Sequence, residues 1–119
     1  MSKTDAFEAA LLDLIFTNAN IANIGDATGL RGAVTAGQLF VSLHSADPGE
    51  AGTQSTNEVS YPGYARVGVA RSGAGFTRTG NSISPAANID FGACTAGSVT
   101  ATHFGIGVAS SGATLLLYK

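Results

Sequence analysis

The stretch that decides the fold is LFVSLHS-ADPGEAGTQSTNEVSYPG-YARVGVAR, residues 39–71. Its first and last segments alternate apolar and other residues, which is the pattern of half-buried β-strands. Between them, Asp47-Pro48-Gly49 predicts a tight turn, because proline fixes φ and glycine tolerates a positive φ. A polar loop of this length in a small domain is usually functional, so we interpret it as a surface that contacts another protein.

The composition indicates one domain whose surface packs against protein neighbours. Of the 119 residues, 45% are hydrophobic and only 12% are charged, about half the charged share of ordinary soluble domains. This balance argues against a disordered chain, which needs high charge and few apolar residues. The net charge of −2 comes with scattered cations, so no nucleic-acid partner is expected.

Three further features narrow the function. The one cysteine, Cys94, excludes an internal disulfide and a cysteine-based metal cage, and we expect it to be a small buried side chain. No apolar run reaches the roughly 18 residues of a membrane span, so no membrane partner is expected. The first residues lack the cleavage site of a signal peptide, which predicts synthesis and folding in a cytoplasm.

Residues 5–18 are expected to form the one helix. Thr4, or Ser2 with Asp5, can cap its start. The helix either covers one end of a β core or docks onto a neighbouring subunit. Its apolar side chains recur with the spacing of one helical stripe, at Phe7, Leu11, Leu14 and Ile15.

The remainder of the chain is expected to be β, with Gly80-Asn81 as the turn of a hairpin. Short strands at this spacing predict a mainly-β fold, a β-sandwich or jelly roll with one N-terminal α-helix. We assign residues 1–37 to the helix and an ordered connector, and residues 38–119 to the β-sandwich domain, within a single structural domain. The expected strands are 39–44, 64–71, 76–79, 82–84, 88–91, 99–108 and 114–118.

No catalytic, cofactor or metal signature stands out. The chain has no nucleophile elbow that would present a serine to His44 or His103 for hydrolysis, and the two histidines lack the spacing of metal ligands. We therefore interpret them as polar positions on strands. A metal that bridges two subunits is the alternative. Gly105 and Gly107 lie in a β run with no helix to receive a dinucleotide, and they more simply let another group approach closely. We expect no enzyme, no cofactor and no small-molecule substrate.

Two strings resemble a family of short virion structural proteins of tailed bacteriophages. They are SLHSADPGEAGTQSTNEVSYPGYARVGVARS at residues 42–72 and THFGIGVASSG at residues 102–112. Members are often labelled tail-fibre proteins, and small β-sandwich proteins of virions also serve as capsid cement. The resemblance therefore implies a virion protein that is assembled in the cytoplasm of the host bacterium.

Two functions follow as hypotheses. The first is a non-enzymatic capsid decoration or cement protein, which stabilises the head by contacts with the major capsid protein and with copies of itself as a homo-oligomer. The alternative is a tail-fibre or baseplate component involved in host receptor binding, although the chain has no tryptophan and no repeat. The expected contact residues lie in the loop, its return and the helix: Asp47, Pro48, Gly49, Glu50, Thr53, Gln54, Glu58, Tyr61, Tyr64, Phe7 and Leu11.

Overall fold

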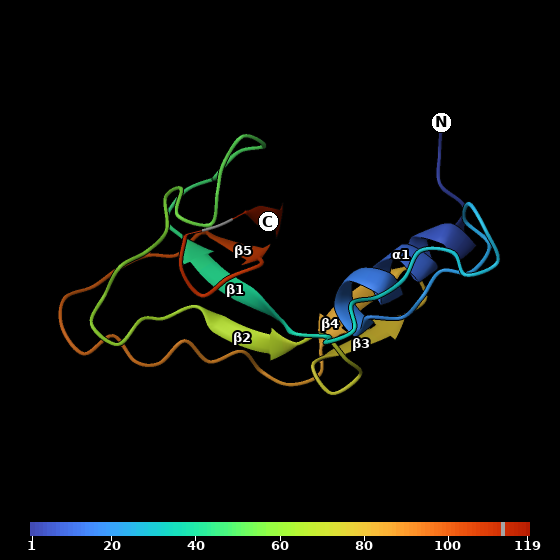
Figure 1. Ribbon diagram of the computed structural model, residues 1–119. Coiled ribbons are helices and arrows are strands. Elements are labelled where there is room, and N and C mark those ends of the chain that lie inside the picture. The colour runs from blue at the N-terminus through green and yellow to red at the C-terminus, as the bar shows by residue number, and fades with distance from the viewer. Residues whose placement is uncertain (113) are drawn as a thin grey trace. The chain divides into compact units, whose positions relative to one another are not determined.

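A computed structural model describes residues 1–112 and 114–119 (Figure 1). In these residues the strands form a four-stranded sheet in the order β2-β1-β5-β6 and a two-stranded sheet of β3 and β4. The expected mainly-β class with one N-terminal helix is confirmed, while sandwich or jelly-roll packing stays a prediction. The elements are α1 (Asp5–Thr17), β1 (Gln38–His44), β2 (Val67–Ala70), β3 (Phe76–Thr79), β4 (Ser82–Pro85), β5 (His103–Gly107) and β6 (Leu115–Tyr118).

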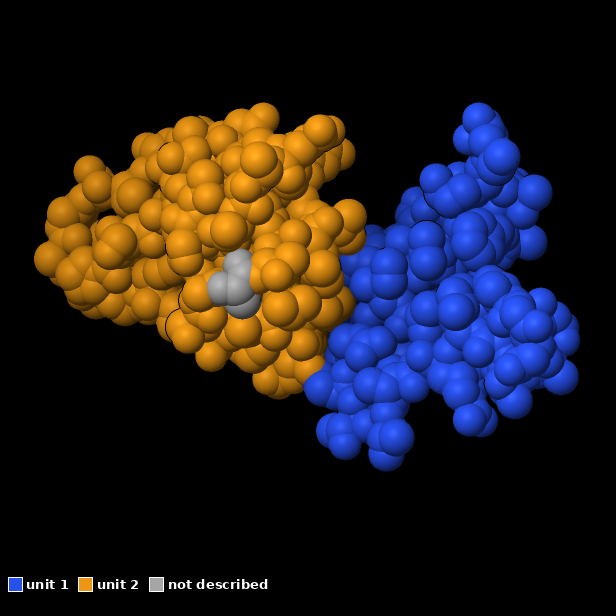
Figure 2. All heavy atoms as spheres, turned by 45° about the horizontal axis from the view of Figure 1, so that its top comes forward, with its two compact units in different colours: residues 1–37, 70–88 blue, residues 38–69, 89–119 orange. Residues whose placement is uncertain are grey.

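The described chain divides into two compact units, coloured separately in Figure 2. The first takes in the expected helix and connector, but also the β3-β4 hairpin, which the sequence assigned to residues 38–119. The hairpin belongs there because Phe76 on β3 packs edge-to-face on Phe16 of α1, with ring centroids 4.9 Å apart. The first unit comprises Met1–Gly37 and Ala70–Asn88, and the second comprises Gln38–Val69 and Ile89–Lys119.

Helix α1 is held at both ends. The Thr4 hydroxyl accepts a hydrogen bond from a first-turn amide, so the Thr4 cap is the expected alternative that forms. The last turn has no basic residue, and Asn18 ends the helix in the left-handed conformation. Arg71 donates to the carbonyls of Leu14 and Ile15 at 2.8 and 2.7 Å, which places a positive charge at the negative end of the helix. In the part that the structure describes, no helix is long and apolar enough to cross a membrane.

The first unit has a small core beneath its helix. Phe16, Ile21 and Phe76 are its buried apolar side chains among the described residues. Arg78 on β3 donates to the Asp13 carboxylate of α1 at 2.7 Å, which ties the hairpin to the helix. The helix and the hairpin therefore stabilise one another by both apolar and charged contacts.

The four-stranded sheet has two faces of different chemistry. β5 runs antiparallel to both β1 and β6, with Phe40 opposite Gly107, Val41 opposite Ile106, and Ile106 opposite Leu117. Side chains alternate between the faces along each strand. We call one the glycine face, formed by Phe40, Ser42, His44, Gly105 and Gly107, and the other the apolar face, formed by Leu39, Val41, Leu43, Phe104, Ile106 and Leu117.

Residues 86–102 contain no helix or strand, so the strand expected over residues 88–91 is wrong. The chain turns there instead, because the Asp90 carboxylate accepts a hydrogen bond from the Gly92 amide at 2.8 Å and Gly92 adopts a φ of +77°. Cys94 lies in this segment and is exposed, not buried as expected. Its neighbours Ala93, Thr95 and Ala96 are small and offer no large apolar side chain to cover it.

The other strands lie within the expected ranges or within one residue of them. Strand β2 fills only the second half of residues 64–71, because the Tyr64 amide donates to the Tyr61 carbonyl in a turn. The hairpin turn at Gly80-Asn81 is confirmed, with Gly80 at a φ of +59° between β3 and β4.

Candidate interaction site

The loop expected to make contacts is closed at its base by the end of β1. The Ser45 amide donates to the Asn57 carbonyl at 2.8 Å, and the Val59 amide donates to the Leu43 carbonyl at 3.0 Å. We call residues 46–56 the β1 loop. Because both of its ends bond to the same strand, the loop is a closed excursion and its tip is the part that can reach a partner.

The predicted turn at the start of the β1 loop is present. Gly49 has a φ of +71°, and its amide donates to the Asp47 carboxylate at 2.8 Å. The Gly52 amide then bonds to the Gly49 carbonyl at 3.0 Å. The Asp47 carboxylate is therefore used within its own turn, which is the usual role of aspartate at this position.

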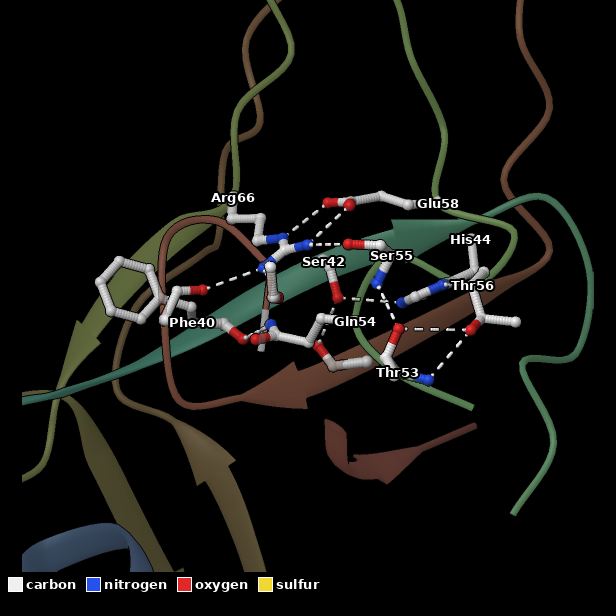
Figure 3. A network of polar contacts seen from close by, with 12 residues as sticks. Phe40, Ser42, His44, Thr53, Gln54, Ser55, Thr56, Glu58 and Arg66 are labelled. Carbon is white, nitrogen blue, oxygen red and sulfur yellow. Dashed lines mark hydrogen bonds and ion pairs between the residues drawn. The ribbon is translucent and has the colours of Figure 1, made fainter. Parts of the chain in front are cut away.

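The second half of the β1 loop is anchored by Gln54, which is fully buried (Figure 3). Its Nε2 atom donates to the Phe40 carbonyl at 3.0 Å. The side chain lies against Gly107, where an added Cβ would come within 2.0 Å of the Gln54 Cδ. Its Oε1 has no hydrogen-bond partner among the described residues. The glycine on β5 thus makes the space that the loop's amide fills.

A buried serine–histidine pair forms the second anchor (Figure 3). His44 Nδ1 lies 2.7 Å from the Thr56 carbonyl, and His44 Nε2 lies 2.9 Å from the Ser42 hydroxyl. A carbonyl only accepts, so Nδ1 donates to Thr56, while Nε2 and the Ser42 hydroxyl share a hydrogen bond. Both side chains are fully buried, which keeps substrates away from the hydroxyl. The pair therefore holds the β1 loop to the strand.

An ion pair closes the return of the β1 loop. Arg66 donates to both carboxylate oxygens of Glu58, from Nε and from one terminal nitrogen, each at 2.7 Å. It also donates to the Ser55 hydroxyl at 3.2 Å and to the carbonyls of Ala109 and Gly112 at 3.1 and 2.7 Å. All five guanidinium hydrogens then have acceptors, so Arg66 crosslinks two loops and has no donor left for a ligand.

Neighbouring groups shift two pKa values in this cluster. Partial burial opposes ionisation of Glu58, but hydrogen bonds from Arg66 and Tyr64 and the arginine charge outweigh it, so its pKa is lowered. Burial is the main cause that raises the pKa of Tyr64 to about 12. The Tyr64 hydroxyl accepts from the Leu43 amide at 3.1 Å and donates to Glu58 at 2.9 Å. At neutral pH Glu58 is therefore ionised and Tyr64 is protonated.

A shallow depression of about 590 Å³ lies over this cluster. Its walls are mostly hydroxyls and backbone, and its charged groups are the internally paired Glu58 and Arg66. No group of three or more metal-binding side chains is found in the described ranges. The lining residues are Ser55, Glu58, Val59, Ser60, Tyr64, Ala65, Arg66 and Ser110–Gly112.

The residues expected to make contacts differ in exposure. Phe7 and Leu11 belong to the first unit and the nine others to the second. The Tyr61 hydroxyl donates to the Phe91 and Gly92 carbonyls at 3.4 and 3.3 Å, so this tyrosine anchors the segment after β4. Phe7, Asp47, Glu50 and Thr53 are exposed; Leu11, Gly49, Glu58, Tyr61 and Tyr64 are partly exposed; Pro48 and Gln54 are buried.

Sequence reasoning did not anticipate the anchors at Ser42, His44 and Arg66. A signal for the first two exists. Ser42 and His44 alternate on β1, and the glycines of HFGIG alternate on the same face of β5, with Gly105 directly opposite Ser42. Polar residues facing glycines across a strand pair indicate that something fills the space above the glycines. The expected close approach at Gly105 and Gly107 is observed.

The apolar face of the sheet is covered over β1 and open over β5 and β6. Leu39 and Val41 are each 4% exposed, whereas Phe104 on β5 and Leu117 on β6 are 41% and 46% exposed. Exposed apolar side chains gathered on one sheet face are typical of surfaces that bind protein.

These features define a small mainly-β protein whose polar side chains bind one another and whose apolar residues lie partly at the surface. A family model described as Podophage GP4 fiber I protein gp80 matches residues 2–119, and the chain belongs to this family. The resemblance to short virion structural proteins of tailed bacteriophages is therefore confirmed. No curated protein and no solved structure matches the chain. The fibre description fits the tail-fibre alternative better than capsid decoration.

Proposed function

We propose that this protein is a non-enzymatic tail-fibre component of a short-tailed phage that takes part in binding the host surface. The observation that carries the proposal is the family match over residues 2–119, which spans both compact units. The match covers the β1 loop and the sheet together, so it concerns the architecture of the whole described chain rather than one motif.

The β1 loop supports a role in contacts. Gln54 and His44 fix its base to the sheet, and Asp47, Glu50 and Thr53 are exposed nearer its tip. A loop that is already ordered loses little conformational entropy on binding. We propose that the tip, together with copies of the same protein, forms the contact surface of the fibre.

The location is tested by counting and by imaging. Purified virions are analysed by quantitative mass spectrometry against the major capsid protein, and gold-labelled antibodies locate the chain on the particle. We expect a few copies in multiples of three or six, with label at the tail. Hundreds of copies, with label over the head, would overturn the fibre proposal. That result would favour a capsid decoration protein that contacts the major capsid protein.

The contact surface is tested by competition. Purified protein should reduce phage adsorption to host cells, and the variant Glu50→Arg/Ala51→Arg at the exposed tip should lose most of this effect. Asn88→Arg, at an exposed position outside the β1 loop, is the matched control and should compete like the wild type. Equal competition by both variants would exclude the tip as the contact.

A further inference from the structure

We draw no further inference here: the strongest candidate, the open half of the apolar face of the four-stranded sheet at Phe104 and Leu117, carries none, because nothing in the described part of the structure shows what covers it.

Discussion

The two faces of the four-stranded sheet reverse the usual rule of burial. On the glycine face, Ser42, His44 and the loop residue Gln54 are fully buried although they are polar. On the apolar face, Phe104 and Leu117 are about as exposed as ordinary surface residues although they are hydrophobic. The polar residues are sealed because they find partners within the chain, whereas the hydrophobic ones have no second layer there.

The difference between the two faces shows which of them is covered by residues of the same chain. Buried polar groups are tolerated only when hydrogen bonds replace water, and the loop carbonyls and glycines of the second unit supply those bonds and that space. An open apolar surface is tolerated only at a cost in hydration, which a partner removes. The glycine face is completed by residues of the same chain, whereas the apolar face stays exposed at Phe104 and Leu117 among the described residues.

The largest expected effect comes from comparing two leucine-to-alanine substitutions, one in each half of the apolar face. Leu39→Ala should lower the free energy of unfolding by about 3 kcal/mol, because it leaves a cavity in a closed site. Leu117→Ala, on the same face but 46% exposed, should cost less than about 1 kcal/mol in dilute protein. Urea unfolding measures both. Equal losses would mean that the face is covered over its whole width.

The next prediction concerns the ion pair between Arg66 and Glu58 beside the glycine face. Arg66→Met should cost about 3 kcal/mol, since it leaves Glu58 partly buried without its ion-pair partner. Arg31→Met is the control, because Arg31 is exposed, and it should change stability by less than about 0.5 kcal/mol. If Arg66→Met unfolded at the wild-type urea concentration, the ion pair would not hold the loop.

Gly107→Ala tests the space above the glycine face. The new methyl would overlap Gln54, so we expect a loss of about 2 kcal/mol from overpacking. Gly73→Ala is the matched control, since a Cβ there meets nothing within 4 Å and the residue has no positive φ. A Gly107→Ala protein as stable as the control would mean that Gln54 does not occupy the site.

The smallest effect is a dependence on pH from Glu58. Its pKa is lowered in the folded protein, so the ionised group stabilises the fold above its ordinary value of 4.5, and that stabilisation is lost as the pH falls through the folded-state pKa. The stability gap between wild type and Glu58→Gln should therefore be present at neutral pH and should shrink steadily in acid. If urea unfolding gave the same stability gap at neutral and at acidic pH, the lowered pKa of Glu58 would be contradicted.

Local patterns predicted much of the fold. The stripe at Phe7 and Leu11 gave the helix to within one residue, and the alternation before His44 gave β1. The strand expected at residues 88–91 failed because Asn, Asp and Gly prefer turns, and their side chains and φ angles decided the conformation. Alternation alone could not tell the two outcomes apart.

The interaction site was harder to predict, because it depends on which side of each strand is covered. The alternation in residues 103–108 placed Phe104 and Gly105 on opposite faces, but it did not say that the glycine would be the buried one. That outcome follows from Ser42 and His44, which lie more than sixty residues earlier in the chain and fill the space above Gly105 together with Leu115. Long-range packing of this kind leaves no local signal.

The position of Arg71 at the end of α1 has a consequence for synthesis. Residues Met1–Gly37 and Ala70–Asn88 make one unit, and the chain between them belongs to the other. During translation, α1 leaves the ribosome long before the arginine and the hairpin that stabilise it, and β1 leaves long before β5. Neither unit can finish folding while the chain is still short. We therefore expect both to fold together late, when nearly the whole described chain has emerged, unlike proteins that fold domain by domain from the N-terminus.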